Sequence, residues 1–153
     1  MSRYVGVVGP SDAADDEVRD AEALGRGLAQ RGHVVVCGGL GGVMAAVARG
    51  AADAGGIVVG LLPGTDRADA NPHVTVALLT GLGELRNALL VRSSDVVVSV
   101  GGSWGTLSEV ALAVRTGVPV VALRGWPLSG DPALHPVTTV EEALAAVDAL
   151  IRP

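Results

Sequence analysis

The chain contains no lysine and no phenylalanine, and aromatic residues make up only 2% of its 153 residues. The absence of lysine excludes the usual phosphate-binding P-loop and any Schiff-base or pyridoxal-phosphate chemistry on a lysine amine. All eleven basic residues are arginine, they form no cluster, and the formal net charge is −5. Nucleic-acid surfaces combine clustered basic side chains with aromatic ones, so we expect no nucleic-acid partner.

Cysteine and long apolar runs are equally scarce. The single cysteine, Cys37, cannot form an internal disulfide, which fits a reducing compartment. The longest uncharged run, residues 32–48, is interrupted by five glycines, so we expect no membrane-spanning segment. The first residues also lack the basic and apolar regions of a signal peptide. We therefore expect a cytoplasmic protein with no membrane partner.

Several motifs of known chemistry are missing. The turn after the first predicted strand reads GPSDAA instead of G-x-G-x-x-G, which argues against a standard NAD domain. The three histidines have no Cys or His partner at metal-ligand spacing, and no G-x-S-x-G nucleophile elbow is present. We expect no metal and no resident cofactor.

Valine-rich runs alternate with segments of helical spacing along the chain. Such runs favour strands buried on both faces, and their alternation with helices indicates right-handed βαβ units around a parallel sheet. The sequence predicts a single Rossmann-like domain over residues 1–153, a three-layer α/β/α sandwich with a mostly parallel sheet. The predicted strands span residues 4–8, 34–36, 57–62, 74–79, 96–100 and 118–123, and residues 124–136 form a loop. The first predicted helix has its cap at Ser11 or Asp12 and ends at Gly32. The other predicted helices lie at 43–54, 84–94, 107–116 and 139–150.

Two glycine-rich turns, GGLGG at 38–42 and GGSWG at 101–105, each follow a strand and precede a helix. This arrangement presents backbone N–H groups and a helix dipole to an anion, although glycines also permit a tight turn without a ligand. Both turns and the turn after the first strand meet at the edge where α/β sheets bind ligands. We predict a nucleotide or another phosphorylated small molecule there, bound by Gly9, Ser11, Gly38, Gly39, Gly41, Gly42, Met44, Gly101, Gly102, Ser103, Trp104, Gly105 and Thr106.

Four of the candidate residues also have a plain structural interpretation. Glu109 ends a T-x-x-E pattern that starts at Thr106, so it either carries chemistry or closes a capping box. Arg86 lies on an amphipathic helix and is either functional or a solvated charge. Met44 suits core packing. Trp104, exposed in its turn, either stacks on a base or lies at a subunit contact.

Four stretches read VGVVGPSDA (5–13), CGGLGGVMAAVARGAADAGGIVVGLLPG (37–64), LRNALLVRSSDVVVSVGG (85–102) and GGSWGTLSE (101–109). They resemble the LOG-like ("lysine decarboxylase-like") family of Rossmann proteins, whose decarboxylase name is a misnomer. The chain is especially similar to a short branch that includes molybdenum-cofactor carrier proteins. The resemblance also implies a homo-oligomer, a dimer or tetramer. The apolar helix around Leu85, Leu89 and Leu90 and the one over residues 107–114 are the candidate contacts, and a monomer is the alternative if these faces belong to the core.

The phosphoribohydrolases of this family carry PGGxGTxxE, preceded by an Arg-Lys pair. Arg86 and Glu109 match their catalytic arginine and glutamate, 23 positions apart. The resemblance implies hydrolysis of a nucleoside 5′-monophosphate to base and ribose 5-phosphate, in which Glu109 stabilises an oxocarbenium-like transition state. Arg86 positions the nucleotide and keeps Glu109 ionised. Gly101, Ser103 and Asn87 depart from the motif and resemble the carrier branch, so a non-catalytic carrier or sensor of a nucleotide or molybdopterin-type cofactor is the alternative.

Overall fold

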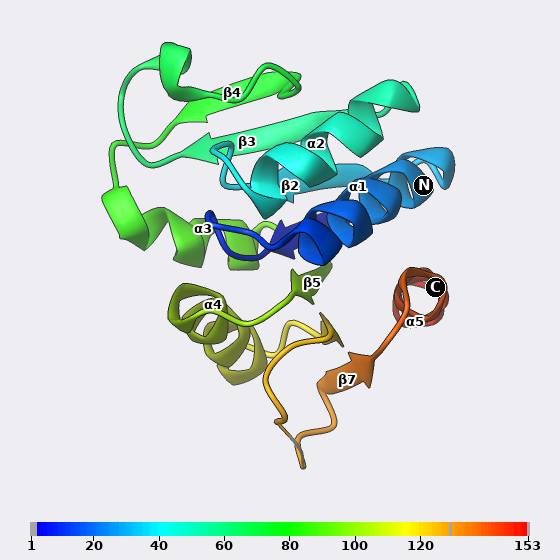
Figure 1. Ribbon diagram of the computed structural model, residues 1–153. Helices are drawn as coiled ribbons and strands as arrows, with labels where there is room; N and C mark the ends of the chain where they lie inside the picture. Colours follow the sequence, from blue (N-terminus) through cyan, green and yellow to red (C-terminus); the bar gives the residue numbers. More distant parts are fainter. Residues whose placement is uncertain (1–2, 129, 153) are drawn as a thin grey trace.

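The computed structural model describes residues 3–128 and 130–152. Its middle layer is a seven-stranded sheet in the order β4-β3-β2-β1-β5-β6-β7, and the strand pairs of the described residues are all parallel (Figure 1). The predicted Rossmann-like α/β/α architecture is confirmed. The strands are β1 (Tyr4–Val8), β2 (Val34–Cys37), β3 (Val58–Leu62), β4 (Val76–Leu79), β5 (Val96–Val100), β6 (Val120–Leu123) and β7 (Leu134–Val137).

Helices cover both faces of the sheet, because successive side chains of these valine-rich strands point to opposite faces and each side must be buried. On one face, the core around Val5 and Val98 packs against α1 (Asp15–Gln30), α2 (Val43–Asp53) and α5 (Val140–Leu150). On the other, the core around Val36 and Val97 packs against α3 (Arg86–Arg92) and α4 (Trp104–Arg115). Two short 3₁₀ helices, η1 (Arg67–Asp69) and η2 (Gly83–Leu85), lie in the loops before β4 and α3.

The first helix has the predicted apolar stripe but begins later than expected. Its inner residues Ala21, Leu24 and Leu28 are fully buried. The expected cap at Ser11 or Asp12 is wrong, because Ala14 is the N-cap and its N–H donates to the Glu17 carboxylate at 2.9 Å. Residues 9–14 are therefore a loop that precedes the helix.

Two further segments differ from the sequence prediction by more than a shift of their ends. The predicted loop over 124–136 is wrong at its end, where β7 pairs with β6. Proline usually disfavours a strand, but Pro136 lies on an edge strand that has a partner on one side only. The helix expected over 84–94 is divided into η2 and the shorter α3.

The order of the strands determines where a ligand can lie. The chain moves outward from β1 to β4 and then returns to place β5 beside β1. Loops on the two sides of such a switch point run in opposite directions and leave a crevice at the carboxyl ends of the strands. No helix in the described parts of the chain is long and apolar enough to cross a membrane.

Candidate functional site

A cavity of about 440 Å³ lies at this switch point, between the turns after β1 and β2 and the starts of α3 and α4. Apolar side chains such as Val8 and Leu90 form its base, and polar groups converge on it from the two helices. Nine residues predicted from the sequence line it together: Gly9, Ser11, Gly38, Met44, Arg86, Ser103, Gly105, Thr106 and Glu109.

The other six predicted residues lie outside the cavity lining and include most of the glycines. Gly42 has a φ of +61°, and a Cβ at this position would lie 2.4 Å from the carbonyl oxygens of Pro10 and Ser11. The next amide, Val43 N–H, donates to the Pro10 oxygen at 3.1 Å. Gly42 therefore allows the turn after β2 to pack closely against the turn after β1. The six are Gly39, Gly41, Gly42, Gly101, Gly102 and Trp104.

The start of α4 lies at the cavity, which Ser103, Gly105 and Thr106 line. Ser103 is the N-cap, and its Oγ accepts the Thr106 N–H at 3.1 Å and lies 2.8 Å from Thr106 Oγ1. The helix begins at Trp104, three residues before the expected start at 107. The first N–H groups of a helix have no carbonyl partner inside it, and with the helix dipole they favour a negatively charged ligand.

Because α4 begins early, Glu109 is too far along the helix to act as a capping residue. A capping glutamate occupies the third position of a helix, whereas Glu109 lies in the second turn of α4. The capping box predicted from Thr106 to Glu109 is therefore wrong, because Ser103 already caps the helix. Glu109 lines the cavity.

Arg86 is buried, with 9% of its surface exposed, so it is not a solvated charge. Its Nε–H donates to the Leu61 oxygen at 2.7 Å, its Nη2 lies 3.4 Å from the Gly38 oxygen, and its Nη1 donates to the Asn87 side chain. These contacts fix the guanidinium between β3 and the glycine-rich turn at 38–42. A guanidinium has five N–H groups, so donors remain for a ligand in the cavity that Arg86 lines.

The Glu109 carboxyl group is poised to exchange a proton near neutral pH. Withdrawal from water raises its pKa to about 7, and the attraction of Arg86 opposes this rise without cancelling it. Arg86 favours the ionised form of Glu109, as expected, but desolvation is the larger effect and leaves the pKa raised. A carboxyl group with a pKa near the working pH can act as a general acid or base.

Three polar residues of the cavity were missed by the sequence prediction: Glu84, Asn87 and Ser108. Glu84 and Asn87 flank Arg86 along the chain, and Ser108 precedes Glu109, so proximity to the motif residues was the available signal. Among the described residues, the charged side chains that line the cavity are thus one basic group, Arg86, and two acidic groups, Glu84 and Glu109. Within residues 3–128 and 130–152, no group of three His, Cys, Asp or Glu side chains is placed to bind a metal ion.

A parallel α/β sheet with a polar cavity at its switch point and a helix start facing that cavity defines a Rossmann-type protein. The chain belongs to the SLOG cluster4 family, whose model matches residues 2–149. This confirms the similarity to LOG-like proteins that the motifs indicated.

Solved structures of molybdenum-cofactor proteins are closely similar. The molybdenum cofactor carrier protein of Chlamydomonas reinhardtii is 35% identical, with a TM-score of 0.92 and 99% of both chains covered. The molybdenum cofactor binding protein of Rippkaea orientalis is 32% identical, with a TM-score of 0.91 and the same coverage. A probable cytokinin riboside 5′-monophosphate phosphoribohydrolase of Oryza sativa subsp. japonica is 35% identical over 106 residues, 67% of this chain and 47% of its own. The chain thus spans about half of that rice protein.

Proposed function

We propose that the cavity binds a nucleoside 5′-monophosphate and that the protein hydrolyses its N-glycosidic bond. The observation that carries this proposal is the meeting of Arg86 and Glu109 in one cavity beside the start of α4. The two residues come from different helices. The similarity to the rice phosphoribohydrolase supports the same reaction.

The phosphate is placed at the start of α4. The first N–H groups of this helix, including that of Gly105, and the Ser103 and Thr106 hydroxyls supply donors on one side of the cavity. In the part of the chain that the structure describes, one basic side chain, Arg86, lines this cavity, beside two acidic ones. This charge balance suits a single phosphate group better than a polyphosphate.

Hydrolysis breaks the bond between ribose C1′ and the base nitrogen. The oxygen of a water molecule adds to C1′ as this bond breaks. The departing base nitrogen takes up a proton from solvent, and the proton that Glu109 accepts from the water returns to solvent afterwards. Ionised Glu109 stabilises the positive charge on the ribose and accepts the proton of the attacking water. Because its pKa is about 7, kcat/KM is expected to rise as the pH increases through this value.

The test is release of free base from a panel of nucleoside monophosphates such as AMP, measured by chromatography. We expect Glu109→Ala to lose base release by about a hundredfold or more, and Glu141→Ala, at an exposed position of α5, to retain it. Base release that survives Glu109→Ala unchanged contradicts the assigned role.

A second candidate function is favoured by the molybdenum-cofactor proteins among the structural relatives. In this case the cavity binds a nucleotide or a molybdopterin-type phosphorylated ligand without turnover. Gly101, Ser103 and Asn87, which depart from the phosphoribohydrolase motif, fit this function. Thermal stabilisation by molybdopterin or AMP, with no base released, would decide for a carrier.

We also propose that the protein forms a dimer or tetramer of identical chains. On α3, Leu89 is exposed by 41%, and Leu85 just before it by 73%. Leu90, also assigned to this contact, is buried in the core with 1% exposure, so that assignment is wrong. A cytoplasmic location and the lack of a nucleic-acid partner stay predictions.

A further inference from the structure

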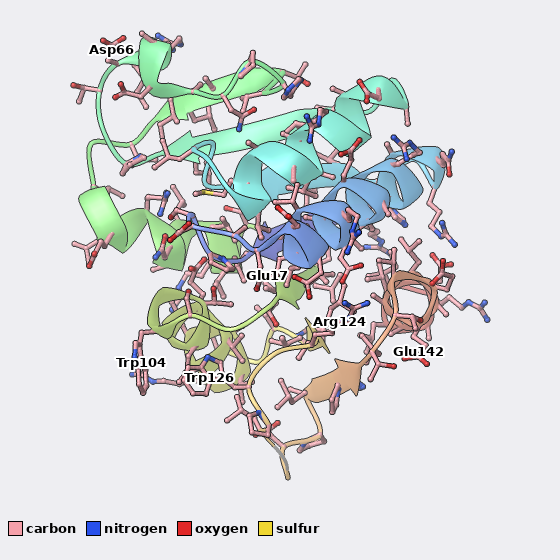
Figure 2. All side chains as sticks on the ribbon, viewed as in Figure 1. Glu17, Asp66, Trp104, Arg124, Trp126 and Glu142 are labelled. Carbon is pink, nitrogen blue, oxygen red and sulfur yellow. The ribbon has the colours of Figure 1, made fainter. Side chains whose placement is uncertain are left out.

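The two tryptophans of the chain lie against each other beside the start of α4 (Figure 2). Their ring centroids are 4.9 Å apart with the planes tilted by 41°. Trp104 is exposed by 77%, whereas Trp126, in the segment after β6, is partly buried. Neither ring lines the cavity. Trp126 therefore lies outside the site, on the segment that follows β6.

Trp126 contacts the backbone of the glycine-rich turn at two points. Its Nε1–H donates to the Ser103 carbonyl oxygen at 3.2 Å. The same oxygen accepts the Leu107 N–H at 2.9 Å, which is the first i→i+4 hydrogen bond of α4. A Cβ at Gly102 would lie 3.2 Å from two atoms of the Trp126 ring, so the indole lies directly on the backbone of this turn.

The segment that carries Trp126 is anchored on its other side. Arg124 Nη1 lies 3.3 Å from an Asp20 oxygen, and its Nε–H donates to the Thr138 oxygen at 3.0 Å. Arg124 has a φ of +52°, a left-handed backbone conformation that is unfavourable for a non-glycine residue. These contacts bind the segment to α1 and to the residues after β7. Trp126 therefore contacts the turn at 101–105 from a segment that Arg124 holds in place.

We propose that Trp126 is a positioning residue of the anion-binding turn. Its indole fixes the Ser103 carbonyl and the Gly102 backbone from outside. The N–H groups at the start of α4 and the paired hydroxyls of Ser103 and Thr106 consequently face the cavity before a ligand arrives. Donors that are held in place in advance bind an anion without a further loss of conformational entropy. The part of this inference that concerns the ligand rests on the proposed function.

The first test needs no ligand. Amide hydrogen exchange, followed by NMR, is compared between the wild type, Trp126→Phe and Trp126→Ala. The phenylalanine variant keeps a ring on Gly102 and loses only the N–H donor. We expect the Thr106 and Leu107 amides to exchange about tenfold faster or more in Trp126→Ala, with an intermediate effect in Trp126→Phe. Wild-type rates at these amides in both variants would overturn the proposal.

The matched control is Leu128→Ala, which shortens an exposed apolar side chain two residues further along the same segment. We expect it to leave exchange at Thr106 and Leu107 unchanged. Equal acceleration by Leu128→Ala would mean that any change to this segment loosens the turn, and the specific role of Trp126 would be lost. If Trp126→Ala fails to fold, Trp126→Phe and the control decide the result.

The second test measures AMP affinity by isothermal titration calorimetry together with the melting temperature. Loss of one hydrogen bond to the turn is expected to weaken AMP binding by about three- to tenfold in Trp126→Phe. The melting temperature should stay close to the wild-type value, which separates positioning from loss of stability. Unchanged affinity in Trp126→Phe would overturn the proposal. If the wild type binds no AMP, the proposed function fails, and the exchange rates alone decide on Trp126.

Discussion

Glu109 combines a titratable carboxyl group with surroundings that disfavour its charge. Removal from water raises its pKa, and Arg86, although charged and in the same cavity, compensates only in part. The reason is that desolvation of the carboxylate is the larger of the two effects. The Arg86 guanidinium also donates to the Leu61 and Gly38 carbonyls and to the Asn87 side chain. A group that binds or releases a proton near pH 7 is suited to chemistry, but it lowers the stability of the empty protein.

The raised pKa of Glu109 predicts that the free energy of unfolding depends on pH. Glu109 has a pKa of about 7 in the folded protein and an ordinary value of 4.5, so the folded state binds more protons between these two values. Stability contributed by this site is therefore lost as the pH rises from about 4.5 to 7, and the loss is complete above 7. Glu109→Gln has no such loss, so its free energy of unfolding relative to wild type should increase between pH 5 and pH 8, by up to about 3 kcal/mol.

Urea unfolding at several pH values measures this difference. Glu141→Gln, which removes an exposed carboxyl group on α5, is the control for the loss of one charge. A stability difference between Glu109→Gln and wild type that does not change from pH 5 to pH 8 would contradict the raised pKa.

At the scale of elements, α1 and α2 pack with their backbones unusually close. A Cβ on Gly50 of α2 would lie 1.9 Å from the Glu22 carbonyl oxygen of α1. A Cβ on Gly25 of α1 would lie 2.1 Å from the Val47 carbonyl oxygen of α2. Each helix therefore presents a glycine to the backbone of the other. This contact sets the position of α2 above the sheet and so the place of the turn that precedes it.

We expect Gly50→Ala to lower the free energy of unfolding by about 3 kcal/mol or more, because the new methyl group meets a backbone atom that cannot move alone. The better helix propensity of alanine would offset only about 1 kcal/mol. Thermal and urea unfolding measure the effect. Gly64→Ala is the control, since the nearest atom to its new Cβ would lie 3.7 Å away. A Gly50→Ala variant as stable as wild type would contradict the close packing.

Sequence patterns predicted the elements well where one signal dominates. The valine run of β5 is placed correctly at both ends, because five successive buried residues leave little choice. The seventh strand was missed because its few residues include Pro136, which argues against a strand unless its place at the sheet edge is known. The start of α4 was misplaced because Ser103 and Thr106 are both good caps. Only the structure shows which one binds the amide.

At the scale of the whole molecule, the apolar surface beside the cavity is the feature that a second chain would cover. A groove of about 530 Å³ between α3 and α4 includes Leu85 and Leu112 and shares Glu109 with the cavity. Burying these leucines in a subunit contact would remove apolar surface from water. A partner in this groove would also shield Glu109.

Leu85→Asp should therefore shift the protein to a monomer at concentrations where the wild type is a dimer or tetramer, because a charge would be buried in the contact. Sedimentation velocity measures the change. Leu128→Asp alters an exposed leucine that does not line this groove, and it should leave the assembly intact. A wild type that sediments only as a monomer would dispose of the oligomer. An assembled Leu85→Asp variant would assign the contact to another surface.

The sequence by itself determined the order of the strands and helices apart from β7, and the three turns that meet at the carboxyl ends of the strands. These follow from local patterns of valine and glycine. The pairing of Arg86 with Glu109 was also visible, through the family motif. The tertiary structure decided that Ser103 caps α4, that Glu109 titrates near pH 7, and that Trp126 supports the turn. Each of these depends on burial or on contacts between segments far apart along the chain, which local sequence patterns do not record.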